Sequence, residues 1–367
     1  MNILSISNDP HDPSSGSGYV ITGYVEGLQR RGHTVDAYGP SHWRMVEVRR
    51  GRRYLYPLLV AFFGVYTHWR RSHSYDLVEL WGGTTWLLAV LLRWVWPNLT
   101  IVHHSNGIEQ HRVTVEQASG LEAVDTSWFQ ADLTGLYDQG LKAADAIVTV
   151  GDYDIPFLRK RQFVSEERVY GIANPLPSPF IGRTIEADRP TRVGFCGSWV
   201  PRKGLHVMRS DLPPFLKNHP SWTFSVVGSR EQDVVTEFPK EIRPQIEVIP
   251  FLEREALIKW YHSLAIFVLP SIYESFGMVT AEAMACGTTA VTTSVGFGYE
   301  LEHGEEAYVL PEAASPHLHE ALSALASDPE KRRVLARSGY EGVQNLTWVR
   351  AVDRLETVYE SIAANDS

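Results

Sequence analysis

The chain has little cysteine, no excess of positive charge and no cluster of metal ligands. Its 367 residues include two cysteines, Cys196 and Cys286, which do not form a disulfide framework and fit a reducing compartment best. The net charge of −9 argues against a nucleic-acid partner. No Cys/His group has zinc spacing. We therefore expect a globular protein of ordinary composition, with 44% hydrophobic residues.

Long apolar segments are also lacking. The first residues, "MNILSISNDP", have neither the basic nor the apolar region of a signal peptide. The longest apolar runs, 54–66 and 86–96, are shorter than the roughly 20 residues that span a bilayer. The sequence predicts a cytoplasmic protein without a membrane-spanning helix.

One segment is compatible with peripheral contact between the protein and a membrane. Residues 42–75 hold seven arginines against one acidic residue, Glu47, with aromatic residues between them. This profile is typical of a surface that lies on the inner face of a membrane. It is equally typical of a core helix over 54–66 whose arginines form a solvated flank. Both interpretations stay open at this point.

Short apolar runs alternate with longer amphipathic stretches along the whole chain. Such alternation predicts α/β architecture, with doubly wound parallel sheets covered on both faces. A proline-rich stretch, 173–190, separates two series, so we expect domains at 1–175 and 176–347, with a last helix over 348–367 packing back onto the first. The expected strands are 2–7, 34–39, 77–80, 100–105, 146–150, 192–198, 223–229, 246–251, 265–271 and 289–294.

A strand, a turn and a helix follow one another in "AIFVLPSIYESFGMVTAEAMACG". The turn carries Glu274 and the helix carries Glu282. Helix N-termini attract phosphate, and carboxylates accept hydrogen bonds from hydroxyls. The pattern therefore indicates a site for a ligand with phosphate and hydroxyl groups. In the alternative interpretation, Glu282 is a solvated helix residue and Glu274 is a helix cap. The amides that would hold the phosphate belong to Phe276, Gly277, Met278 and Val279.

Residues 270–294 closely resemble the E-x7-E signature of retaining glycosyltransferase family four, the "group 1" glycosyltransferases. The resemblance implies the GT-B fold, two Rossmann-like domains that face each other across a cleft. It implies transfer of a sugar from a nucleotide sugar to an acceptor hydroxyl with retention of configuration. By the same resemblance, Glu274 binds the donor sugar, Glu282 binds the ribose, and the amides of 276–279 hold the sugar and diphosphate.

The segment "GFCGSWVPRKGLH" (194–206) resembles the family's strand–loop–helix motif. Lys203 matches the family lysine that neutralises the diphosphate, a charge that grows in the transition state. Ser198 departs from the family, which usually has arginine there, and Arg202 is the candidate for the missing charge. Gly228, at the end of a strand, resembles the turn near the diphosphate or the base.

Two N-terminal segments resemble family loops. Gly16 and Gly18 form a glycine loop before the first helix that could approach phosphate or sugar. In "VHHSNGIEQHR" (102–112), either His104 or Asn106 takes the place of the family histidine that approaches the donor sugar. We assign His104 a catalytic role, and Asn106 and Glu109 to the acceptor side.

The implied partners are a nucleotide-sugar donor and a glycan, lipid-linked or small-molecule acceptor. No metal or other cofactor is expected: the D-x-D sequence at 152–154 imitates a metal motif, but Asp152 reads as a helix N-cap. Two alternatives share this architecture. One is a non-hydrolysing sugar-nucleotide epimerase, and the other is a non-catalytic subunit that binds sugar nucleotides.

Overall fold

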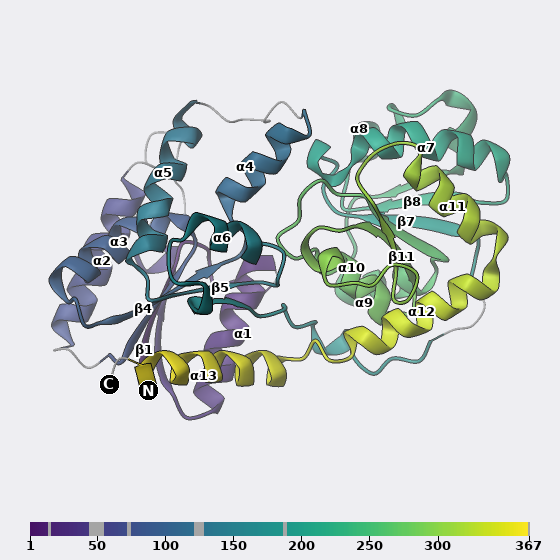
Figure 1. Ribbon diagram of the computed structural model, residues 1–367. Coiled ribbons are helices and arrows are strands. Elements are labelled where there is room, and N and C mark those ends of the chain that lie inside the picture. The colour runs from purple at the N-terminus through teal and green to yellow at the C-terminus, as the bar shows by residue number, and fades with distance from the viewer. Residues whose placement is uncertain (14–15, 44–54, 72–74, 121–127, 186–188, 366–367) are drawn as a thin grey trace. The chain divides into compact units, whose positions relative to one another are not determined.

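The computed structural model describes residues 1–13, 16–43, 55–71, 75–120, 128–185 and 189–365. The chain divides into two compact units. The N-terminal unit comprises Met1–Val113, Ala123–Pro175 and Trp348–Ser367, and the C-terminal unit comprises Thr114–Glu122 and Leu176–Thr347. Each unit is built on its own parallel sheet (Figure 1). None of the described helices combines the length and the hydropathy needed to cross a bilayer.

The sheet of the N-terminal unit has six strands in the order β2-β1-β3-β4-β5-β6. All neighbouring pairs are parallel. The chain proceeds from β1 to one side and then, from β3 onward, to the other, so the strand order reverses between β1 and β3. The strands are β1 (Asn2–Ser7), β2 (Thr34–Tyr38), β3 (Leu77–Trp81), β4 (Thr100–Ser105), β5 (Ala146–Thr149) and β6 (Val169–Gly171).

Helices cover both faces of this sheet because successive strand side chains point to opposite sides. Ile3 of β1 belongs to a core that contains residues of α1 and α13. Its neighbour Leu4 belongs to a second core, formed with α2 and α3. The helices are α1 (Gly16–Arg30), α2 (Tyr56–Arg70), α3 (Trp86–Val95), α4 (Glu109–Ala118), α5 (Trp128–Ala143), α6 (Ile155–Arg161) and α13 (Trp348–Asn365).

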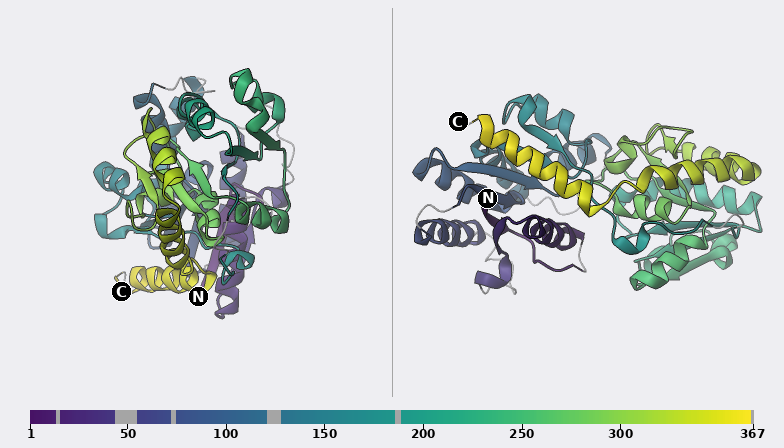
Figure 2. Two further views of the ribbon diagram at one scale, coloured as in Figure 1. Left: turned by 90° about the vertical axis from the view of Figure 1, so that its right-hand side faces the viewer. Right: turned by 90° about the horizontal axis from the view of Figure 1, so that it is seen from below.

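The last helix, α13, returns to the N-terminal unit and lies beside α1 (Figures 1 and 2). It also delivers a hydroxyl to the centre of the unit. Tyr359 donates a hydrogen bond to the buried carboxylate of Glu79, and its oxygen lies 3.0 Å from Nε2 of His104. Burial raises the pKa of Glu79. The α13 helix thus completes a buried polar network as well as an apolar core.

The C-terminal unit repeats the same design. Its parallel sheet has the order β12-β11-β10-β7-β8-β9, and the strand order reverses between β7 and β10. The strands are β7 (Arg192–Cys196), β8 (Thr223–Val227), β9 (Ile246–Ile249), β10 (Ile266–Leu269), β11 (Thr289–Thr293) and β12 (Tyr308–Leu310). The helices are α7 (Leu205–Asn218), α8 (Glu231–Val235), α9 (Arg254–His262), α10 (Met278–Ala285), α11 (His317–Ser327) and α12 (Pro329–Val343).

The predicted parallel α/β architecture and all ten predicted strands are confirmed. Two local predictions are wrong. The first helix begins at Gly16, so Gly16 and Gly18 are helical residues and not a loop. Helix α6 begins at Ile155, which places Asp154 and not Asp152 at its N-cap position.

The buried network makes a prediction about stability. The substitution Tyr359→Phe removes the only hydroxyl that α13 gives to Glu79 and His104 among the described contacts. Leaving buried polar groups without a partner typically costs about 1–3 kcal/mol. We expect a lower free energy of unfolding by that amount in urea titrations. The control Tyr66→Phe, at an exposed site on α2, should cost much less. Equal stability of the two variants would contradict the network.

Candidate active site

Two loops of the C-terminal unit meet where its strand order reverses. One follows β7 and contains Arg202 and Lys203, and the other follows β10 and contains Ile272 and Glu274. The backbone N–H of Ile272 donates to the carbonyl of Arg202 at 2.8 Å, which ties the loops together. Ligands of open α/β sheets bind at such a point, beyond the carboxyl ends of the strands.

Positive and negative side chains converge in these loops. Nζ of Lys203 lies 2.5 Å from Oε1 of Glu274, and both side chains are largely buried. Ser271 donates its hydroxyl to the same carboxylate oxygen at 2.7 Å. Arg202 lies 3.8 Å from that oxygen and 3.4 Å from the carbonyl of Tyr273. The structure therefore brings together three residues that the sequence assigned to one site.

Glycine permits the tight loop geometry at three points. Gly277 precedes α10 with φ of +87°, a left-handed conformation that suits glycine. Gly204 has φ of +78°, and a Cβ there would lie 1.9 Å from the carbonyl oxygen of Pro270. A side chain at Gly204 would push the lysine loop away from β10. Gly228 also has positive φ and follows β8, with its N–H bonded to the carbonyl of Ile249.

The start of α10 presents donors next to this charge cluster. Within the described part of the chain, the backbone N–H groups of Phe276, Gly277, Met278 and Val279 make no hydrogen bond. The ring of Phe276 is buried against Phe297, with ring centroids 5.2 Å apart, so the side chain anchors the turn. Helix N-termini with open amides and partial positive charge suit anions.

Glu282 lies on α10, beyond the first turn. Its Oε2 accepts a hydrogen bond of 3.1 Å from the hydroxyl of Tyr261, which is fully buried. Loss of hydration raises the pKa of Glu282 to about 7, although Tyr261 and Arg254 lower it in part. The side chain still keeps partial contact with solvent. The carboxyl group of Glu282 therefore titrates near pH 7, and its partial exposure leaves it accessible to a ligand.

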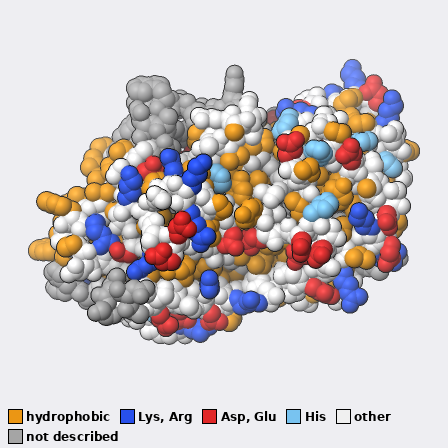
Figure 3. All heavy atoms as spheres, viewed as in Figure 1, with side chains coloured by type: hydrophobic (Ala, Val, Ile, Leu, Met, Phe, Trp, Pro, Cys, Tyr) orange, Lys and Arg blue, Asp and Glu red, His pale blue; other side chains and the backbone are white. Residues whose placement is uncertain are grey.

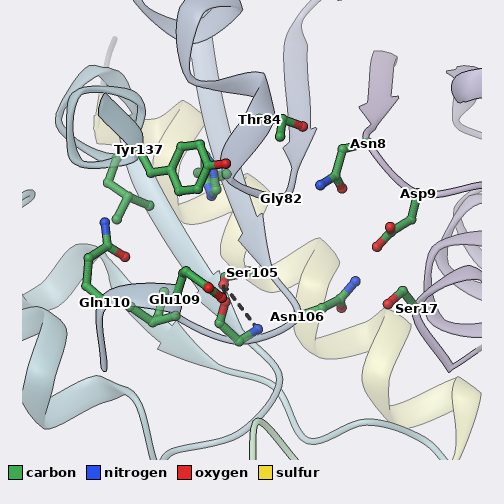
Figure 4. Close-up of a pocket in the computed structure, with 15 residues that line it drawn as sticks. Asn8, Asp9, Ser17, Gly82, Thr84, Ser105, Asn106, Glu109, Gln110 and Tyr137 are labelled. Carbon is green, nitrogen blue, oxygen red and sulfur yellow. Dashed lines mark hydrogen bonds between the residues drawn. The ribbon is translucent and has the colours of Figure 1, made fainter. Parts of the chain in front are cut away.

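A cavity of about 410 Å³ lies in the N-terminal unit. It sits beyond the carboxyl ends of β1, β3 and β4, beside the point where this sheet also reverses its order. Asn8, Asp9, Thr84, Asn106 and Tyr137 surround one hollow in Figure 4. This volume falls in the range of small-molecule sites. The two acceptor-side residues that the sequence predicted, Asn106 and Glu109, both line it.

The expectation for His104 is corrected by the structure. Its side chain is 1% exposed, stacks on Trp81 with centroids 4.0 Å apart, and contacts Tyr359. Burial lowers its pKa to about 3. Along a strand, neighbouring side chains point to opposite sides, and the preceding residue, His103, is the one that lines the cavity. The alternation in "TIVHHS" shows that one histidine faces the core and the other the cavity. Which one faces the cavity follows only when the core face of the strand is known.

Comparisons with known proteins agree with this geometry. Residues 190–328 match the family "Glycosyl transferases group 1". D-inositol 3-phosphate glycosyltransferase from Corynebacterium diphtheriae is 26% identical and covers 99% of this chain and 95% of its own length. The chain therefore resembles the group 1 glycosyltransferases, and the family match covers most of its C-terminal unit. A phosphatidyl-myo-inositol mannosyltransferase from Mycobacterium leprae is 27% identical over 46% of this chain and 45% of its own length.

Several solved structures share the fold. Sucrose-phosphate synthase from Thermosynechococcus elongatus superposes with a TM-score of 0.77 at 20% identity, covering 100% of both chains. Anabaena HepE in complex with UDP gives a TM-score of 0.71 at 15% identity, over 98% of this chain and 100% of that one. The protein therefore has the GT-B fold, as its sequence predicted.

The carboxyl group of Glu282 makes a prediction about pH. Its pKa is about 7 in the folded protein, above the ordinary value of 4.5. Between these pH values the folded state holds more protons than the unfolded chain, so stability falls as pH rises through this window. Glu282→Gln cannot titrate. In the nucleotide-free protein, the melting temperature of wild type should fall relative to that of Glu282→Gln between pH 5 and pH 8.

The control is Glu241→Gln, at an exposed position of the same unit. Its melting temperature should follow that of wild type across the same pH series. A difference between wild type and Glu282→Gln that does not change with pH would show that the Glu282 carboxyl titrates as an ordinary surface group.

Proposed function

We propose that this protein is a group 1 glycosyltransferase that transfers a sugar from a nucleotide diphosphate sugar to an acceptor hydroxyl with retention of configuration. The observation that carries the proposal is the contact between Lys203 and Glu274 beside the open amides of α10. One ligand with a diphosphate and a hydroxyl-rich sugar satisfies a cation, a helix N-terminus and a carboxylate together.

The chemistry follows from where charge develops. The bond between the anomeric carbon and the phosphate oxygen breaks, and the nucleotide diphosphate gains negative charge. Lys203, Arg202 and the α10 amides stabilise that charge. The acceptor oxygen forms its bond to the anomeric carbon on the same face. Its proton passes to the departing phosphate, so this route needs no protein nucleophile and no metal.

The existing contacts explain how one lysine can serve two partners. An ammonium group has three donors, and Glu274 occupies one of them. The remaining donors can bind diphosphate oxygens while Glu274 keeps the lysine in place. Ser271 also holds the carboxylate, which leaves its other oxygen for a sugar hydroxyl. Arg202, beside this pair, takes the role of the arginine that Ser198 replaces.

The two glutamates should give separable defects. Glu282→Ala removes a group that we place on the ribose, so it should weaken nucleotide binding about tenfold or more. Glu274→Ala removes the group on the transferred sugar and releases Lys203, so it should mainly lower turnover, by roughly a hundredfold. Calorimetry with nucleotide diphosphates and a turnover assay with a panel of nucleotide sugars separate the two effects.

Glu241→Ala, a surface change in the same unit, is the matched control and should behave as wild type. If both site variants kept wild-type affinity and rate, the assignment would be wrong. Epimerised free nucleotide sugar without an acceptor would identify an epimerase instead. Binding of nucleotide sugars with neither hydrolysis nor transfer would identify a non-catalytic subunit.

We further propose that α2 and the end of α3 contact an anionic membrane surface. One side of α2 is buried and the other exposes large apolar side chains, as Phe62 does at 75% exposure. Trp94, at the end of the neighbouring helix α3, is 81% exposed. Apolar side chains gather over this region at the left margin of Figure 3. The patch comprises Leu55, Leu58, Leu59, Phe62, Tyr66, Trp69, Trp94 and Val95.

The basic residues of 42–75 indicate that the membrane surface that this patch contacts is anionic. Arg70 and Arg71 lie at the end of α2, and the five other arginines fall in 44–54, outside the described residues. Exposed aromatic side chains with adjacent arginines suit the headgroup region of anionic lipids. The core-helix interpretation holds for one face of α2 only, because Val60, Ala61 and Gly64 are buried.

The membrane proposal is tested by vesicle sedimentation. The double variant Phe62→Glu/Trp69→Glu should bind vesicles of anionic phospholipid at least tenfold more weakly, since burying one such aromatic stabilises by about 1.5–3 kcal/mol. Val334→Glu, at an exposed apolar site in the other unit, is the control. Wild-type protein that fails to sediment, or a double variant that sediments equally well, would reject the membrane contact.

A further inference from the structure

The cavity of the N-terminal unit carries information about the acceptor. Its polar lining comes from strand ends and helix starts: Asn8, Asp9, Ser17, Thr84, His103, Ser105, Asn106, Glu109, Gln110 and Tyr137. None of the described residues that line it is lysine or arginine. The set consists mainly of uncharged groups that both donate and accept hydrogen bonds, which is the chemistry that hydroxyl groups require.

Several of these groups are buried and have no partner within the described structure. They include Oγ1 of Thr84 and Oδ1 of Asn106. Buried polar atoms are normally paired, so a site that gathers several unpaired ones points to an absent ligand. Burial lowers the pKa of His103 to about 4, and the nearby Gly82 backbone offsets this only in part. The imidazole is therefore neutral at pH 7, with one donor and one acceptor.

Charges at the rim disfavour an anion. Glu109 is held by Arg112, whose Nε lies 3.2 Å from Oε2 and whose Nη2 contacts Oε1. The charge of that arginine is thus compensated. Asp9 lines the cavity and forms no ion pair with any described lysine, arginine or histidine, so its carboxylate adds negative charge there.

The partial positive charges of nearby helix N-termini do not outweigh the negative charge at the cavity. The start of α1 supplies about half a positive charge, less than the charge of Asp9. At the start of α4 the N–H of Ile108 is already bonded to Asp154, at 3.3 Å, and Gly107 N–H is bonded to Ser105 Oγ at 3.2 Å. A phosphate in this cavity would meet Asp9 and a neutral imidazole, and none of the described lining residues is a lysine or arginine that could bind it.

We propose that the acceptor group that enters this cavity is an uncharged polyhydroxylated ring, a sugar or cyclitol, and not a phosphorylated one. This rests on the proposed transfer reaction. It separates the protein from its relatives that are named for D-inositol 3-phosphate. Asp9 is a specificity residue in this assignment: its carboxylate accepts a hydrogen bond from a ring hydroxyl and repels a phosphate.

The test compares matched probes that differ by one phosphate. Dissociation constants of myo-inositol against D-inositol 3-phosphate, and of glucose against glucose 6-phosphate, are measured by ligand-observed NMR on the full chain. The neutral member of at least one pair should bind tenfold or more tightly than its phosphorylated partner. Asp9→Asn should narrow that gap several-fold. Thr84→Val should weaken the neutral probe, and Glu26→Gln, at an exposed site on α1, should change neither.

Tighter binding of the phosphorylated member, or no binding of either member in both pairs, would overturn the assignment. Donor binding is measured separately by titration with UDP and GDP. If those nucleotides fail to bind while the neutral ring still binds tenfold more tightly than its phosphate, the transfer reaction fails and the polyol site stands. If the nucleotides bind and the phosphorylated rings are preferred, the polyol assignment fails and the transfer reaction stands.

Discussion

The molecule depends on one constraint of parallel sheets. Where the strand order reverses, the loops that leave two neighbouring strands turn to opposite faces and leave space beyond the carboxyl ends. Each unit has one such point, between β1 and β3 and between β7 and β10. The charge cluster around Lys203 lies at the second, and the polar cavity lies beside the first. Residues that are distant in sequence therefore come together because they follow the carboxyl ends of neighbouring strands.

The two sites differ in how they treat charge. In the C-terminal unit, a buried lysine and glutamate compensate each other beside helix amides, so both charges are already in place without a ligand. In the N-terminal unit, the lining histidine is kept neutral by burial. An environment that loses water favours the uncharged form of a lone imidazole. Such a contrast suits a donor that is an anion and an acceptor that is not.

Much of the fold was predictable because buried parallel strands are short apolar runs with glycine or proline at their ends. The strands that sequence analysis missed, β6 and β12, have three residues each, too few to show a period. Helix α12 begins at Pro329 after a short turn and was missed between α11 and α13. Gly16 and Gly18 were misplaced because glycine usually indicates a loop, whereas here the packing of α1 outweighs its low helix propensity.

The sequence by itself determined the local geometry of the proposed donor site. Glu274, Glu282 and the α10 start lie within nine residues, so local strand–turn–helix geometry fixes their relation. Only the tertiary structure decided the rest. It brought Lys203 to Glu274 across 71 positions, and it chose His103 over His104 for the cavity. That choice depends on which face of β4 packs against α13, and Tyr359, 255 residues beyond His104, supplies the partner that holds His104 in the core.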